Sequence, residues 1–201
     1  MQPDFMCAGK ISSVESVLQE HLAYRMTHLD GLVWAAECLL GTPRSGSIVL
    51  HFEGQASMFM LTNPLFEVGT LNCRLVMDFL GIRIDKGNRL APVLPRRPDD
   101  LGVEDLGLPP VTVSDFLKCG PTQQVESSTI KMLIAADKGV AHFTVNPGGR
   151  AWAPDALVCA DAVMACVDRY VYKALGKPVA GYRRWTAGMA AMRGVTPLTT
   201  T

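Results

Sequence analysis

The sequence predicts an all-α fold, a helical bundle of about four main helices. Apolar residues recur every three or four positions over several long stretches, and residues that start or stop helices bound these stretches. The clearest stretch covers residues 63–80, where the periodic apolar positions are Leu65, Val68, Leu71, Leu75, Val76, Phe79 and Leu80. We expect this segment to be the central helix of the bundle.

Both ends of this central helix carry sequence signals. Asn63 can cap the helix by accepting a hydrogen bond from a backbone N–H, and Pro64 suits the first helical position. Gly81 follows the last apolar residue and can adopt the left-handed conformation that ends many helices. We therefore expect the helix to begin at Asn63 and to end before Gly81.

Composition limits the kind of protein. The 201 residues suit one domain, 1–201, with a frayed tail at 195–201. Hydrophobic residues make up 48% of the chain, which allows a core and argues against global disorder. The 19 basic and 19 acidic side chains cancel, so the chain is not built for strong non-specific binding to nucleic acid. No signal peptide and no run of about 18 apolar residues occur, so we expect a cytoplasmic protein without a membrane segment.

The spacing of the six cysteines favours free thiols. No Cys-x-x-Cys pair and no zinc-finger spacing with histidines occurs. Four cysteines lie within apolar helical patterns, where a buried thiol behaves as a small hydrophobic group: Cys38, Cys73, Cys159 and Cys166. We predict no metal site and no cofactor.

A long helix is expected near the start of the chain. Ser12 and Glu15 have the spacing of a capping box, in which each side chain bonds to the backbone beside the other. The apolar pattern continues over residues 14–40, and Gly41 supplies the stop.

Residues 47–62 fit two structures. Two mainly apolar segments, 48–52 and 56–61, flank a short polar segment with Gly54, as in a small β-hairpin over 47–61. An apolar helix that runs up to Asn63 fits equally well. We favour the hairpin slightly, because glycines interrupt the segment.

The connection after the central helix is long. Residues 82–84 suit a short extended piece. Residues 85–112 then read as an irregular loop with five prolines and many charges. A loop of this length within a compact domain is unusual and is either functional or mobile.

Three further helices follow, one of them brief. Ser114 can cap the brief helix, and Ser127 or Ser128 can cap the next one. The last long helix has Pro154 in its first turn and stops at Gly176.

Two blocks resemble a known group of proteins. The segment CRLVMDFL, residues 73–80, resembles the ARNLLDFL block of small, mostly uncharacterised bacterial helical proteins. The segment DKGVAHFT, residues 137–144, resembles their later block, NKxVAHLT. Such proteins resemble HEPN domains, helical bundles that often serve as ribonucleases or nucleotide-binding modules in defence systems. The resemblance covers residues 14–145 and implies RNA or a nucleotide as the ligand, which the net charge does not support.

The chain departs from the catalytic HEPN pattern. That pattern is an arginine, a polar residue, three more positions and then a histidine on one helix. Counting back from His142, the place of the arginine falls on Asp137, which cannot bind a phosphate as a guanidinium does. The ribonuclease site that the resemblance implies is therefore incomplete.

Arg74, Asp78 and His142 are the candidate catalytic residues. Arg74 and Asp78 are four positions apart on the central helix, so they can form a structural ion pair or a polar patch that faces His142. Histidine has an ordinary pKa of about 6.5, which suits general acid–base catalysis. His142 can equally be a structural residue bonded to a backbone carbonyl or to Asp78.

Two other groups of residues have features of binding sites. Arg183, Arg184 and Trp185 combine cations with an aromatic ring, as single-strand nucleic-acid sites do, or belong to a tail docked by its aromatic rings. His21 and His28 lie on the first helix, but a metal site would need further ligands from elsewhere, so a solvated helix face is the simpler interpretation.

No catalytic set is complete, and apolar surface is ample, including residues 58–61. We therefore predict a non-enzymatic helical binding or regulatory module that forms a homodimer. The alternative is a divergent HEPN-like ribonuclease or nucleotide-binding protein, with His142 as the acid–base group and Arg74 as the phosphate contact.

Overall fold

The computed structural model describes residues 13–41, 55–93, 95–97, 99–140 and 152–179. Its long helices are α2 (Ala23–Leu40), α3 (Gln55–Leu80), α5 (Thr122–Ile134) and α6 (Ala153–Val167), and its short ones are α1 (Val14–Ser16) and α4 (Val113–Leu117). The strands in these residues are β1 (Ile82–Ile84) and β2 (Leu90–Pro92), which pair antiparallel. The predicted all-α class is confirmed.

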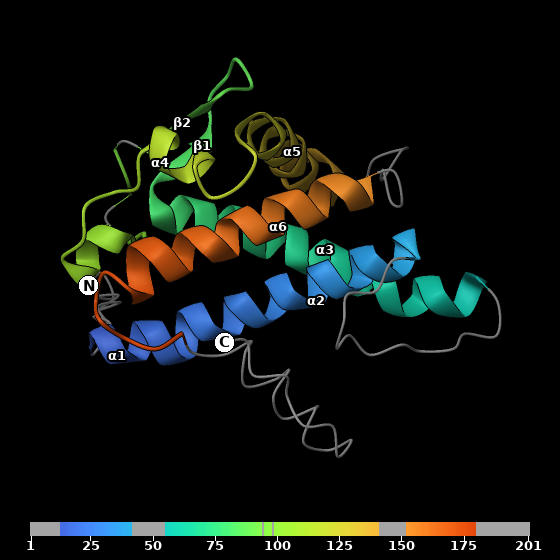
Figure 1. Ribbon diagram of the computed structural model, residues 1–201, viewed down its shortest axis with the longest axis horizontal. Helices are drawn as coiled ribbons and strands as arrows, with labels where there is room; N and C mark the ends of the chain where they lie inside the picture. The colour runs from blue at the N-terminus through green and yellow to red at the C-terminus, as the bar shows by residue number, and fades with distance from the viewer. Residues whose placement is uncertain (1–12, 42–54, 94, 98, 141–151, 180–201) are drawn as a thin grey trace, which may run out of the picture.

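The long helices form a bundle around one apolar core (Figure 1). Helix α2 packs against α3 and α6, and α5 covers α6 from the other side. Helices α3 and α6 both run opposite to α2, and the β1–β2 hairpin lies on top beside α5. Within the described segments, no helix is both long and apolar enough to cross a membrane.

The first helix is continuous from Val14 to Leu40, as expected, but it contains a π-helical turn, η1 (Val17–Leu22). Its cap is Ser13, whose hydroxyl accepts a hydrogen bond from the Ser16 N–H at 3.2 Å. Ser12, the predicted cap, lies outside the described residues. Gly41 ends the helix in the left-handed conformation, with φ of 70°.

The predicted start of the central helix is wrong. Within the described residues, helix α3 already runs from Gln55, so Asn63 and Pro64 lie inside it. The second strand of the predicted hairpin, residues 56–61, is helical, and residues 47–54 lie outside the described part of the chain. Pro64 removes the hydrogen bond to the carbonyl of Met60, and that residue is 81% exposed, so water can bond there instead. The predicted end is confirmed, because Gly81 follows with φ of 99°.

Residues 85–112 are more ordered than predicted. They contain β2 and a 3₁₀ turn, η2 (Val103–Leu106), and residues 82–84 form β1 as expected. Two backbone hydrogen bonds of 2.9 Å pin the segment to the end of α3, from the Val93 N–H to Gly81 and from the Val111 N–H to Leu80. The segment therefore folds back over one end of the central helix.

Two predicted caps of later helices are wrong. Thr112, not Ser114, caps α4 and accepts a hydrogen bond from a backbone N–H in the first turn. Helix α5 begins directly after the Gly-Pro break at 120–121, so Ser127 and Ser128 lie inside it. Pro154 lies in the first turn of α6, as predicted.

Helices α2 and α3 approach each other closely at Gly69. A Cβ atom added there would overlap the Cβ of Leu32 and would lie 2.9 Å from the carbonyl oxygen of His28. Nearby, Arg25 of α2 donates a hydrogen bond of 3.1 Å to the side chain of Asn72, which is buried on α3. The close approach at Gly69 and this hydrogen bond together fix how α2 and α3 lie against each other.

Candidate functional site: an arginine-lined cleft

A cleft of about 650 Å³ opens at the C-terminal end of α3. Its walls come from the first helix, α3, β1, the segment 93–101, and the end of α5 with its π-helical extension η3 (Ala135–Val140). The lining holds one histidine, five arginines and four aspartates: His21, Arg25, Arg74, Arg83, Arg96, Arg97, Asp78, Asp99, Asp100 and Asp137. The volume lies in the range of small-molecule sites.

Arg74 lies between two carboxylates. Its Nε is 3.9 Å from Asp78 on the same helix, and its guanidinium also forms an ion pair with Asp137 of η3. All three side chains are about two-fifths exposed, so solvent and ligands can reach them. The ion pair with Asp137 joins α3 to η3 across the cleft.

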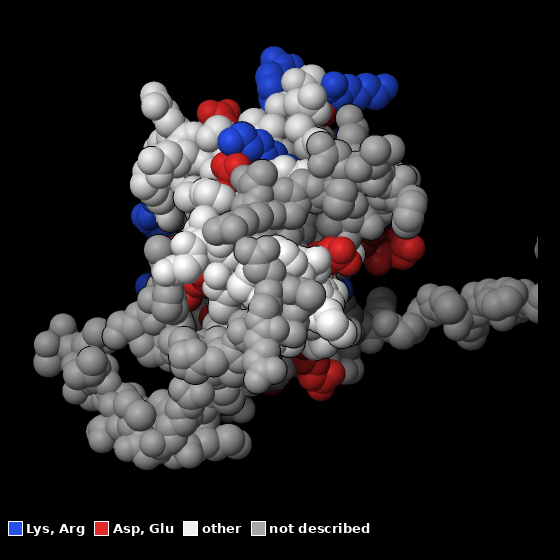
Figure 2. All heavy atoms as spheres, turned by 90° about the vertical axis from the view of Figure 1, so that its right-hand side faces the viewer, with Lys and Arg blue, Asp and Glu red and all other residues white. Residues whose placement is uncertain are grey.

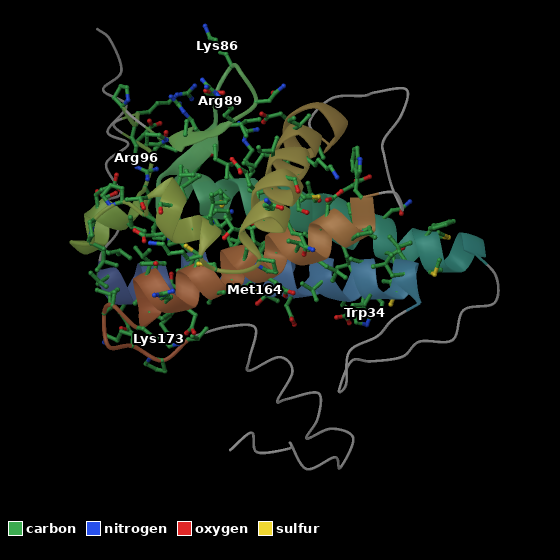
Figure 3. The ribbon with its side chains drawn as sticks, turned by 45° about the horizontal axis from the view of Figure 1, so that its top comes forward. Trp34, Lys86, Arg89, Arg96, Met164 and Lys173 are labelled. Carbon is green, nitrogen blue, oxygen red and sulfur yellow. The ribbon has the colours of Figure 1, made fainter. Side chains whose placement is uncertain are left out.

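Arg96 anchors the loop that forms the outer wall. Its side chain is 12% exposed and pairs with Glu104 at 3.0 Å. It also donates hydrogen bonds to the carbonyl oxygens of Asp78 and Phe79, in the last turn of α3. Carbonyls at a helix C-terminus have no partner within the helix and carry a partial negative charge, so a guanidinium is well placed there. Figure 3 places Arg96 at the opposite end of the molecule from Trp34 of α2.

Asp78 has a perturbed acidity. Burial raises the pKa of its carboxyl group above the ordinary value, and the charge of Asp137 acts in the same direction. The guanidiniums of Arg74 and Arg96 oppose the shift without cancelling it. A carboxyl group with a raised pKa in a cleft is a candidate acid–base group.

Arg83 and Arg97 differ from the other arginines of the cleft. Both are exposed, and no carboxylate among the described residues pairs with either of them. Arg25 bonds to the Asn72 amide, whereas Arg74 and Arg96 form ion pairs. Two guanidiniums of the cleft therefore remain available for an anionic group.

The cleft also has an apolar wall. It consists of Leu75, Phe79, Ile84, Val93, Leu101 and Leu133. A ligand that fits both kinds of lining carries an anionic end and a less polar body.

Two π-helical turns contribute cleft residues. His21 lies in η1 and Asp137 in η3. Single π-helical turns inside α-helices are rare in proteins, and many of those that occur lie at functional sites.

Only some residues of the predicted site belong to the part of the chain that the structure describes. The structure brings Arg74 and Asp78 together in the cleft and adds Asp137 to them. His142 lies outside the described residues, as do Arg183, Arg184 and Trp185. Nothing in the described structure tests their assigned roles.

The two histidines of the first helix have different surroundings. His21 lines the cleft. His28 packs edge-on against Tyr24, with ring centroids 4.5 Å apart, and burial together with Arg25 lowers its pKa. No three potential metal-binding side chains cluster in the described part of the chain.

Sequence analysis missed Arg83, Arg96 and Arg97 as site residues. The sequence does carry a signal for Arg96 and Arg97. They form a basic pair before Pro98, and the acidic pair Asp99-Asp100 follows it, in the segment after the central helix.

The basic hairpin tip is a separate surface. Figure 3 labels Lys86 and Arg89 in the turn between β1 and β2. Blue side chains also gather at the top of the face in Figure 2, where this turn lies. Arg89 is 80% exposed, pairs with Asp85 at 3.1 Å and does not line the cleft.

Comparisons of this chain with models of protein families, with curated proteins and with solved structures found no match.

Proposed function

We propose that this chain is a helical binding module whose cleft takes a small ligand with a phosphate group and an apolar or aromatic body, such as a nucleoside monophosphate. The observation that supports it most is the pair Arg83 and Arg97, two exposed cleft guanidiniums without a carboxylate partner among the described residues. The fork of N–H donors on a guanidinium matches phosphate oxygens in geometry and charge. The apolar wall then suits a nucleobase.

Calorimetric titration tests this proposal. Wild-type protein is titrated with a nucleoside monophosphate and with the same nucleoside lacking the phosphate. We expect the phosphate to account for most of the affinity. We also expect Arg83→Ala and Arg97→Ala each to weaken binding about tenfold, the scale of one charge-assisted hydrogen bond.

Arg89→Ala is the matched control, because it removes an exposed arginine outside the cleft. It should leave the affinity unchanged. Equal affinity for nucleoside and nucleotide, or unchanged affinity in both cleft variants with intact circular dichroism, would reject the proposal.

A second candidate is the divergent HEPN-like ribonuclease. Arg74 reaches residue 137 from α3, so a guanidinium lies beside the position where the HEPN pattern has its arginine. Asp78, with its raised pKa, is next to it. RNA cleavage by the wild type, Asp78→Asn and His142→Ala tests this candidate. Equal rates in all three proteins, or no cleavage by any of them, would reject it.

The predicted homodimer has its own test. Size-exclusion chromatography with light scattering should give twice the chain mass of 21.8 kDa, and a uniform monomer would contradict it.

A further inference from the structure

The β1–β2 hairpin carries basic side chains from the cleft out to its tip. Residues 83–89 contain three cations and one carboxylate: Arg83, Lys86, Arg89 and Asp85. Arg83 lies on β1 and lines the cleft, whereas Lys86 and Arg89 lie in the turn at the tip (Figure 3). The chain as a whole has no net charge, so this hairpin is a local excess of positive charge.

The strand register places Arg83 and Arg89 on the same face of the hairpin. Arg83 is opposite Ala91 in the antiparallel pair. The ladder continues beyond the strands, because the Asp85 N–H donates to the Arg89 carbonyl at 2.9 Å. Side chains two positions apart along a strand point to the same face, so Arg89 is the diagonal neighbour of Arg83. Such neighbours lie roughly 7–8 Å apart.

The tip holds its arginine in a fixed position. One carboxylate oxygen of Asp85 accepts hydrogen bonds from the backbone N–H groups of Gly87, at 2.8 Å, and Arg89, at 3.0 Å. The other oxygen accepts a hydrogen bond of 3.1 Å from the Arg89 guanidinium. Lys86 is exposed, and no carboxylate among the described residues pairs with it. The tip therefore presents two cations to solvent on an ordered turn.

These cations continue the arginine pair of the cleft. Together, Arg97, Arg83, Arg89 and Lys86 form what we call the basic row. A ligand with a single phosphate can use only the end of the row that lies in the cleft. A strand of nucleotides carries a phosphate at every step and also a terminal base that suits the apolar wall. Sites for single-stranded nucleic acid combine these two features, a line of cations and a surface for bases.

We propose that the basic row extends the cleft into a binding surface for single-stranded nucleic acid, an inference that rests on the proposed function of the cleft. One terminal nucleotide occupies the cleft with its phosphate on Arg83 and Arg97. The following phosphates lie against Arg89 and Lys86. An oligonucleotide then binds more tightly than a mononucleotide, because each further phosphate contact releases counterions.

Titration of the full chain with two ligands at several salt concentrations tests the proposal. The ligands are thymidine 5′-monophosphate and a 5′-phosphorylated tetranucleotide of thymidine. We expect the tetranucleotide to bind about tenfold more tightly at low salt. Lys86→Ala and Arg89→Ala should each weaken its binding by about threefold to tenfold and reduce the slope of log affinity against log salt by about 0.7. Neither variant should change the affinity for the mononucleotide.

Lys173→Ala is the matched control. Its side chain is 70% exposed and pairs with Asp168 at 2.9 Å, much as Arg89 pairs with Asp85. Figure 3 places Lys173 on the opposite side of the molecule from Lys86 and Arg89. This variant should bind both ligands as the wild type does.

The two ligands separate failure of this inference from failure of the proposed function. If the mononucleotide binds but the tetranucleotide binds no more tightly, or if both tip variants bind the tetranucleotide as the wild type does, the inference is overturned and the proposed function stands. If neither ligand binds, both are overturned. A peptide of four glutamates that binds as tightly as the tetranucleotide would also overturn the inference, because the row would then be a general surface for anions.

Discussion

The substitution Gly69→Ala gives a sharp test of the contact between α2 and α3. An alanine in a helix is ordinarily about 1 kcal/mol more stable than a glycine. At residue 69, however, the new methyl group would overlap the Cβ of Leu32 and would lie 2.9 Å from the carbonyl oxygen of His28. Neither atom can move by side-chain rotation, so the helices must separate. Overpacking of this kind costs up to about 3 kcal/mol.

The net effect is a destabilisation of about 2 kcal/mol, which lowers the Tm by roughly 4–8 °C for a chain of this size. Thermal unfolding followed by circular dichroism measures the shift. Gly31→Ala on α2 is the matched control, because its nearest neighbour would be Leu65 Cδ2 at an ordinary 3.5 Å. This control should gain up to about 1 kcal/mol. If Gly69→Ala is stabilised as much as Gly31→Ala, the close approach of the two helices is refuted.

Three further predictions concern single side chains. Arg96→Met removes the hydrogen bonds to the last turn of α3 and should lower the free energy of unfolding by about 2–3 kcal/mol. The control Arg89→Met should lower it by less than about 1 kcal/mol. Equal losses for the two variants in urea unfolding would contradict the role of Arg96. Tyr172→Phe removes a buried hydrogen bond of 3.0 Å to the carbonyl of Leu18 and should cost about 1–2 kcal/mol in the same assay, so an unchanged midpoint would count against this bond. Burial raises the folded-state pKa of Asp78 above its ordinary 3.8, so the native state favours the protonated carboxyl group. The protonated group therefore adds to the free energy of unfolding fully below the ordinary pKa, and this contribution is lost as the pH rises through the raised pKa. Asp78→Asn should therefore be more stable than the wild type at about pH 7 and lose this advantage near pH 3 in thermal melts, and a variant less stable at neutral pH would refute the shift.

The helical class could be predicted from periodicity, because the bundle buries one stripe of each long helix. The stop signals Gly41 and Gly81 were also correct, since both adopt the left-handed conformation that glycine favours. The start of α3 was not predictable from capping rules alone. Pro64 fits a first turn, but it is also tolerated inside a helix where the affected carbonyl reaches water.

The candidate site could be predicted only where local spacing carries the signal. Arg74 and Asp78 are adjacent because they are four positions apart on one helix. Asp137 joins them through tertiary packing, and its approach depends on a π-helical turn that has no sequence signature here. Arg83 lines the cleft from β1, directly after α3. Arg97 reaches the cleft because the segment 85–112 folds back onto the end of α3, through backbone hydrogen bonds that side-chain patterns do not encode.

The most direct test of the proposed ligand site is a crystal structure of the protein grown with a saturating nucleoside monophosphate. The account predicts the phosphate within hydrogen-bond distance of the guanidiniums of Arg83 and Arg97, with the base against the apolar wall beside Leu75. An empty cleft under these conditions, or a nucleotide bound only at another surface, would contradict it.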